Sequence, residues 1–286
     1  MLQYPPLPYE QMTLPKVTKK QLEILLLIYR YRFIDRKQIQ TFLTHKNHRR
    51  IHAWLTDLVE KDCIGGIYSN KMPENTKPTV YYLGKNGRKI LVQHFRDIAT
   101  TVEDGDGTTD VDIQQLTNTY KDSQRTEIFR ICCLALVHIA ITTQSVADAE
   151  GYNLVFASPT VCQTYSLLSK FDSYARFQKG KGKKKHYVFL YITNRTPKRF
   201  IRYRIAEVIK FLTREWDYET TDPKPMVLCI CSNIPIRNYT KKLIESKLEY
   251  YRPDEPLNFG LTTLSEYKAH SFSPQHWKHP TIKEDW

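Results

Sequence analysis

The chain has 286 residues, of which 41% are hydrophobic and 26% are charged. This composition is typical of one or two globular domains and excludes a disordered tail. The longest nearly unbroken apolar run, Ile131 to Ile141, is shorter than the ~20 residues that a membrane span needs, so we expect a buried helix there and no membrane association. The first residues lack the basic start and apolar stretch of a signal peptide.

Basic residues outnumber acidic ones by 43 to 30, which gives a formal net charge of +13. Such a chain favours polyanionic partners, above all nucleic acid. The net charge is +9 over residues 1–97, −5 over 98–127 and +10 over 128–250. We therefore predict a DNA-binding domain over 1–97, an acidic linker over 98–122, an α/β domain over 123–250 and an irregular extension over 251–286.

The six cysteines form no Cys-x-x-Cys pair, and five of them lie inside or beside apolar segments. This pattern is typical of reduced thiols packed as small hydrophobic side chains. Reduced thiols predict a cytoplasmic protein.

The N-terminal block contains signals for three helices followed by two strands. Thr18 is a good N-cap residue, and apolar residues follow it at helical spacing. Asp35 can cap a second helix, and Asn47 starts a third. Short strands over 64–69 and 79–83 follow, joined by a polar loop. This order predicts a winged helix-turn-helix.

The third predicted helix has the chemistry of a DNA-reading helix. An α-helix fits the major groove, its exposed face reads base edges, and flanking cations bind phosphates. We expect Arg49, Ala53 and Thr56 to share one outward face, with Arg49 placed to pair with guanine and Asn47 with adenine. The alternative is an exposed charged face that is only solvated. The predicted contacts are Lys46, Asn47, His48, Arg49, Arg50, Ala53 and Thr56 in the helix, and Lys71 and Lys77 in the loop.

Three histidines in this segment, His45, His48 and His52, have spacings that zinc ligands can use. No cysteine or carboxylate lies nearby at a matching spacing, and the neighbouring residues are cationic. We therefore predict no metal site and no cofactor.

Three segments of the N-terminal third are similar to the replication-relaxation family, whose members come from plasmids and integrative elements of Gram-positive and related bacteria. The resemblance implies a role in plasmid replication or in DNA relaxation linked to transfer. The segments are Thr18-Lys-Lys-Gln-Leu-Glu-Ile-Leu-Leu-Leu-Ile-Tyr-Arg-Tyr-Arg-Phe33, Arg36-Lys-Gln-Ile39 and Val80-Tyr-Tyr-Leu-Gly-Lys-Asn-Gly-Arg88.

The C-terminal block alternates helix and strand signals, which predicts an α/β fold with a mixed sheet. Its order resembles the core of the restriction-endonuclease-like superfamily. The expected elements are a helix over 123–143, strands over 153–157, 167–177 and 186–192, a helix over 197–216, a strand over 226–231 and a helix over 236–250.

The nuclease resemblance implies two acidic motifs that hold magnesium beside the scissile phosphate. This chain offers Asp172 for the first motif, but Tyr191 and Thr193 stand where the second motif has acids. We therefore predict an inactive nuclease-like domain with no catalytic residues, in which Asp172 is a structural polar group. The alternative is a nuclease with a different ligand set, such as Glu127, Asp172 and Glu207.

Cations dominate what remains of this block, and each phosphate that a cation neutralises adds affinity without sequence readout. Nearby aromatic residues are candidates for stacking on unpaired bases, although aromatic residues that alternate in strands are more often core. The stacking candidates are Tyr174, Phe177, Tyr187 and Tyr203. The predicted DNA contacts are Lys183, Lys184 and Lys185 in a loop and Lys198, Arg199 and Arg202 in the following helix.

Other enzyme classes lack their motifs, because the chain has no His-x-His for a rolling-circle initiator or relaxase and no Gly-x-x-x-x-Gly-Lys-Ser/Thr phosphate loop. We therefore predict a non-catalytic protein that binds double-stranded DNA site-specifically on a mobile element. A replication or transfer enzyme of the same element is an expected partner, and a homodimer is left open. The alternatives are a metal-dependent nuclease or nickase and a simple transcriptional regulator.

Overall fold

The computed structural model describes residues 14–68, 78–101, 116, 118–157, 168–182, 184–219, 223–270 and 278–280. It is a mixed α+β protein whose described strands form two sheets. We call the part built from residues 14–124 the N-terminal unit and the part built from 127–280 the sheet unit. The N-terminal unit contains α1 (Lys19–Tyr31), β1 (Ile34–Asp35), α2 (Arg36–Phe42), α3 (His48–Glu60), β2 (Ile64–Ile67), β3 (Val80–Leu83), α4 (Lys85–Thr101) and the 3-10 helix η2 (Asn118–Gln124).

Side-chain caps start the first three helices where the sequence predicts them. The Thr18 and Asp35 side chains each accept a hydrogen bond from the third helical backbone N–H, in capping boxes completed by Gln21 and Gln38. The Asn47 carboxamide oxygen accepts hydrogen bonds from two N–H groups of α3. These caps satisfy backbone donors that a helix start leaves open. The three predicted helix starts are confirmed.

The small sheet has the order β1-β3-β2, all antiparallel, and its strands are shorter than the predicted ones. Strand β1 and helix α4 are additions to the predicted elements. Helix α4 begins against the turn between α3 and β2, where the Gly84 N–H donates to the Cys63 carbonyl. A Cβ on Gly87 would lie 2.1 Å from that same carbonyl oxygen. Gly87, in the segment from Val80 to Arg88, is therefore required because the backbone of Cys63 approaches it closely.

The sheet unit contains a five-stranded sheet with the order β4-β5-β6-β7-β8 among the described strands. Strands β4, β5 and β6 are antiparallel, whereas β7 and β8 continue parallel to β6 through helical crossovers. The predicted mixed sheet is confirmed. The elements are α6 (Glu127–Glu150), β4 (Asn153–Ala157), β5 (Ser173–Gln178), β6 (Lys185–Ile192), α8 (Lys198–Arg214), α9 (Trp216–Glu219), β7 (Met226–Cys231), α10 (Ile234–Tyr251), β8 (Phe259–Thr263) and α11 (Leu264–His270).

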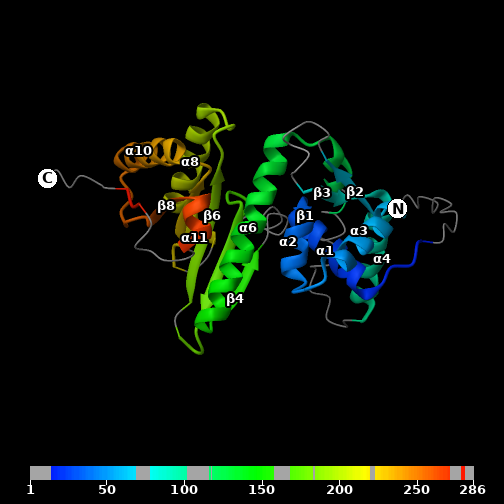
Figure 1. The fold of residues 1–286 in the computed structure, drawn as a ribbon. Helices are drawn as coiled ribbons and strands as arrows, with labels where there is room; N and C mark the ends of the chain where they lie inside the picture. Colours follow the sequence, from blue (N-terminus) through cyan, green and yellow to red (C-terminus); the bar gives the residue numbers. More distant parts are fainter. Residues whose placement is uncertain are drawn as a thin grey trace, which may run out of the picture.

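Helices cover both faces of this sheet, as Figure 1 shows. Helices α8 and α10 pack on one face, in a core that includes Val188, Leu190 and Ile205. Helices α6 and α11 pack on the other face, in a core that includes Phe189 and Leu228. Because β7 and the part of β6 after His186 are buried on both faces, their sequences are continuously apolar, as is usual for parallel strands.

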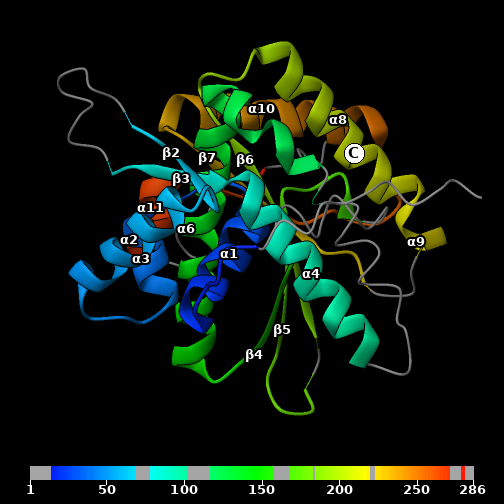
Figure 2. The ribbon, with the colours of Figure 1, turned by 90° about the vertical axis from the view of Figure 1, so that its right-hand side faces the viewer.

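Helix α6 is shared by the two units, and this explains why it is apolar around its circumference. Val137 and Ala140 belong to the core of the N-terminal unit, whereas Leu136 and Ile139 belong to the core under the sheet. Figure 2 shows α1 and α4 in front of α6. Among the described helices, α6 alone is long and apolar enough to cross a membrane. The core helix of a water-soluble protein can have the same length and composition. Its burial between two packed units identifies it as a core helix.

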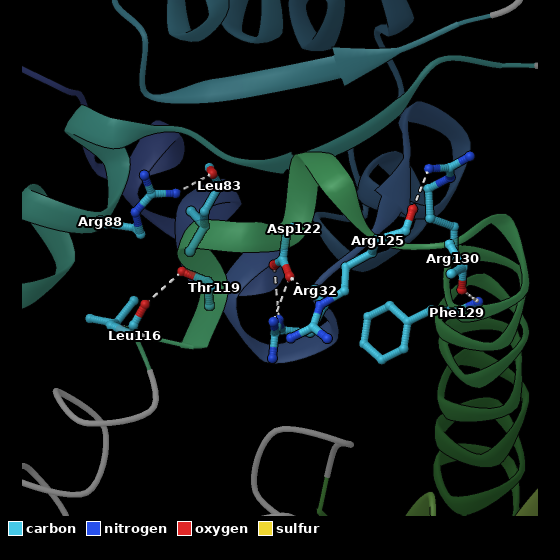
Figure 3. A network of polar contacts seen from close by, with 10 residues as sticks. Arg32, Leu83, Arg88, Leu116, Thr119, Asp122, Arg125, Phe129 and Arg130 are labelled. Carbon is cyan, nitrogen blue, oxygen red and sulfur yellow. Dashed lines mark hydrogen bonds and ion pairs between the residues drawn. The ribbon is translucent and has the colours of Figure 1, made fainter.

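A buried ion pair joins the end of α1 to η2 (Figure 3). The Arg32 guanidinium donates to both carboxylate oxygens of Asp122, at 2.9 and 2.5 Å, and the two side chains are 4% and 1% exposed. The guanidinium groups of Arg32 and Arg125 also lie over the ring of Phe129 in α6. Asp122, at the end of the predicted linker, is therefore buried against the end of α1.

Three predictions of local structure are wrong. The predicted strand over 167–177 begins only at Ser173, because residues 168–172 form a turn closed by the Phe171 N–H on the Leu168 carbonyl. The helix predicted over 123–143 begins after its N-cap Thr126 and continues to Glu150. The predicted irregular extension over 251–286 contains β8, which completes the sheet beside β7, and α11, which packs on α6.

The described cysteines, at positions 63, 132, 133, 229 and 231, are free thiols, and Cys162 lies outside the described residues. Burial raises the pKa of Cys63 to about 11 and the pKa of Cys132 to about 12. Both are therefore protonated near neutral pH.

Candidate nucleic-acid interface

Helix α3 is fixed in the N-terminal unit by its inner face and by one polar cluster. Ile51, Leu55 and Leu58 are completely buried. Asp57, on the flank of α3, accepts hydrogen bonds from Gln21 of α1 and from Lys61, and the Lys61 bond is the largest cause of the lowered pKa of Asp57. These contacts set the rotation of α3, so the opposite face points outward.

The outward face of α3 presents cations and small polar groups to solvent. Arg49, Ala53 and Thr56 are all exposed, as their predicted spacing requires. The Thr56 hydroxyl is hydrogen-bonded to His52 Nδ1 at 3.1 Å. Arg50 lies over the indole of Trp54, 5.5 Å from the ring centroid. The face consequently presents the Arg49 guanidinium beside the small side chains of Ala53 and Thr56 on a rigid helix.

Asn47 differs from its predicted role. Its carboxamide oxygen accepts the backbone N–H groups of Arg49 and Arg50, at 3.0 and 3.3 Å. Bidentate recognition of adenine needs that same oxygen as an acceptor for the base amino group. Asn47 therefore acts here as the cap of α3, and the capped helix start holds Arg49 in place.

The structure brings together the predicted contacts Lys46, Asn47, His48, Arg49, Arg50, Ala53 and Thr56, all of which are exposed. The predicted loop contacts Lys71 and Lys77, and Lys183 of the β5–β6 loop, lie outside the described residues. Among the residues that the structure describes, no group of three or more His, Cys, Asp or Glu could hold a metal ion.

A second cationic surface lies on α8, in the sheet unit. Lys184, in the loop before β6, and Lys185, the first residue of β6, are also exposed, but at the start of that strand, whereas α8 follows its end. Lys198, Arg199 and Arg202 are exposed in the first turns of α8. Figure 2 shows α8 at the upper right, apart from α2 and α3 at the left edge. The predicted contacts on α3 and on α8 therefore form two separate surfaces.

The four stacking candidates divide between the core and the surface. Phe177 is buried in the core under the sheet, and Tyr187 packs beside it. Tyr174 is half-buried, with its hydroxyl 2.8 Å from His186 Nδ1. Tyr203 is instead 64% exposed, and so is Phe200 at 61%. Phe200 was missed from the sequence, although its position outside the apolar stripe of α8 was a signal that could have revealed it.

Asp172 lies in the turn before β5 and is fully engaged by the protein itself. Its Oδ1 accepts a hydrogen bond from Arg204 at 2.5 Å, and its Oδ2 accepts the backbone N–H of Tyr191 at 2.7 Å. Burial opposes the charge of Arg204, but the Asp172 carboxylate outweighs it and raises the pKa of the guanidinium. A protein cation therefore neutralises this carboxylate.

Tyr191 does not supply the missing charge. Burial raises the pKa of Tyr191 to about 12, so its phenol is neutral near pH 7. A hard cation such as Mg²⁺ prefers charged oxygen ligands. The alternative ligand set is also divided, because Glu127 pairs with Arg195, and Glu207 pairs with Lys170.

Comparisons with protein-family models, with curated proteins and with solved structures found no match to this chain. Any functional conclusion therefore rests on the residues and their geometry.

Proposed function

We propose that this protein binds double-stranded DNA site-specifically through the exposed face of α3 and that the N-terminal unit is a winged helix. The order α1-β1-α2-α3-β2-β3 and the sheet order β1-β3-β2 support this assignment. The single observation that supports DNA reading most directly is the exposed row Arg49, Ala53 and Thr56 on a helix whose opposite face is completely buried. Arginine at such a position pairs with guanine in the major groove.

We further propose that the sheet unit is a nuclease-like core without catalytic activity. The order of α6, three strands, α8 and β7 supports this likeness. The contacts of Asp172 with Arg204 and Tyr191 favour a structural role over metal binding. The resemblance of three N-terminal segments then suggests an accessory role in replication, relaxation or transfer of a mobile element, with an enzyme of that element as partner.

The test is selection of bound sequences from random duplex DNA, followed by titration of the selected duplex with the full chain. Arg49→Ala is expected to weaken binding and to relax one base position, whereas Lys242→Ala, on an exposed part of α10, should change neither. Binding should be unchanged by EDTA. If the Arg49→Ala protein keeps both the affinity of the unaltered protein for the selected duplex and its discrimination against a scrambled duplex, the assignment of α3 is refuted.

A further inference from the structure

The outward face of α8 combines exposed aromatic rings with cations, a combination that the α3 face lacks. Phe200 and Tyr203 are 61% and 64% exposed, although aromatic side chains are normally buried when a core is available. They stand three residues apart, so they are neighbours on one helical face. Arg199 is four residues before Tyr203 and lies on the same face.

The cations of this surface are placed against the preference of the helix itself. Lys198, Arg199 and Arg202 lie in the first turns of α8, where the partial positive charge of the helix start repels cations. The first turn contains no acidic residue, and Pro197 provides no side-chain cap. The helix dipole therefore disfavours Lys198 and Arg199, the first two residues of α8, whereas charge complementarity to a bound polyanion accounts for them and for Arg202 in the next turn.

The packing of α8 leaves this face open. Ile201, Ile205 and Val208 are buried in the core against the sheet, which fixes the rotation of the helix. Lys198 lies over the ring of Tyr239, 5.4 Å from its centroid, and so connects α8 to its neighbour α10. The surface is thus a rigid platform on the side of the sheet opposite α6 and the N-terminal unit (Figure 1).

We infer that this α8 platform, made of Lys198, Arg199, Phe200, Arg202 and Tyr203, is a binding site for single-stranded nucleic acid. Unpaired bases expose their π-faces and stack on aromatic side chains, while neighbouring cations follow the phosphates. The bases of a duplex are already stacked on one another, so exposed Phe and Tyr rings contribute little to duplex binding. The platform extends the proposed function, because it adds to a DNA-binding protein a second site, for a different ligand, on the side of the sheet opposite the N-terminal unit.

The test uses the full chain and labelled oligo(dT) of 20 nucleotides in anisotropy titrations at several salt concentrations. Tyr203→Ala is expected to raise the dissociation constant roughly 5- to 100-fold, and Tyr203→Phe is expected to keep most of the affinity. Tyr250→Ala removes a more exposed ring, 75% exposed, on α10 and serves as the matched control, with no expected change. Circular dichroism melts of each variant check that the fold is kept.

An abasic oligonucleotide of the same length separates stacking from charge. We expect it to bind much more weakly than oligo(dT) and to be insensitive to Tyr203→Ala. Equal binding of the two oligonucleotides, or no effect of Tyr203→Ala on oligo(dT), would overturn the inference and leave a merely electrostatic surface. A change in the oligomeric mass of the free protein on Tyr203→Ala, without a change in oligo(dT) affinity, would instead identify a contact between copies of the chain and would also overturn it.

The two proposals fail in distinguishable ways. Arg49→Ala should reduce affinity for the selected duplex and leave oligo(dT) binding intact, and Tyr203→Ala should do the reverse. Loss of the first effect alone refutes the proposed function of α3, whereas loss of the second alone refutes the platform.

Discussion

Helices α3 and α8 are both cationic and both exposed, but they are built differently. Helix α3 starts at a side-chain cap, and its aromatic residue Trp54 is half-buried under Arg50. Helix α8 starts without such a cap and presents two bare aromatic rings. A row of arginine and small side chains suits the edges of paired bases. Exposed aromatic rings suit the faces of unpaired bases. The comparison of the two helices therefore shows that positive charge alone does not define which nucleic acid a surface suits.

The two helices also belong to one body, because α6 packs against both units. Mutations can therefore test the difference between the two helices in two ways. Some lower the stability of the fold that carries both surfaces, and others change binding at one surface alone.

The largest effect is expected from Arg32→Met, which leaves the buried Asp122 carboxylate with only the longer contact to Arg125, at 3.7 Å. Breaking a buried ion pair in this way costs about 3–5 kcal/mol of unfolding free energy. Urea unfolding should show this loss, and a double variant Arg32→Met/Asp122→Leu should recover most of it. A loss below about 1 kcal/mol in the single variant would show that the pair does not hold the end of α1 to η2.

Gly87→Ala should disturb the N-terminal unit, because the added Cβ meets a backbone carbonyl that cannot move aside easily. Overpacking of this kind costs about 1–3 kcal/mol. Gly66→Ala is the control, since its Cβ would meet side chains rather than backbone, the Thr79 methyl group at 3.1 Å and the Tyr81 ring at 3.8 Å. Thermal melts measure both variants, and equal melting temperatures would contradict the close approach of α4.

Arg49→Ala should cost about 1–3 kcal/mol of binding free energy to the selected duplex. The reason is the loss of a bidentate contact to guanine. Competition with duplexes altered at one position at a time measures the effect. If the variant discriminates every position as the unaltered protein does, Arg49 reads no base.

Asn47→Ala removes the cap of α3 and should lower stability by about 1 kcal/mol. Asn47→Ser should keep most of it, since the hydroxyl can accept the same N–H groups. We expect any loss of duplex affinity to match the loss of stability and to be the same whichever base occupies a given position of the duplex. A specific loss at adenine positions would instead restore the base-reading role predicted from the sequence.

Lys184→Ala should have the smallest effect, because this exposed side chain is expected to neutralise one phosphate without reading sequence. The slope of log affinity against log salt should flatten by about one unit, equally for all sequences. If the loss of affinity instead depended on the DNA sequence, Lys184 would be contacting base edges rather than phosphate.

Local signals in the sequence were sufficient for much of the fold. Caps at Thr18, Asp35 and Asn47 defined three helix starts, because a cap acts on neighbouring backbone groups. Strands 153–157 and 226–231 were predicted at their observed bounds, since turns or a long helix bracket each apolar run. The exposed face of α3 followed from helical periodicity for the same local reason.

Tertiary structure decided what depends on residues far apart in the chain. The pairing of Arg32 with Asp122 and of Asp172 with Arg204 spans 90 and 32 residues, and no local pattern reveals such partners. Strand β8 exists because β7 offers it an edge to pair with, not because its own sequence is strongly strand-forming. The exposure of Phe200 and Tyr203 likewise depends on how α8 is rotated against the sheet. Sequence by itself determined the elements and the cationic character of the chain, whereas packing determined which side chains were left free to meet a ligand.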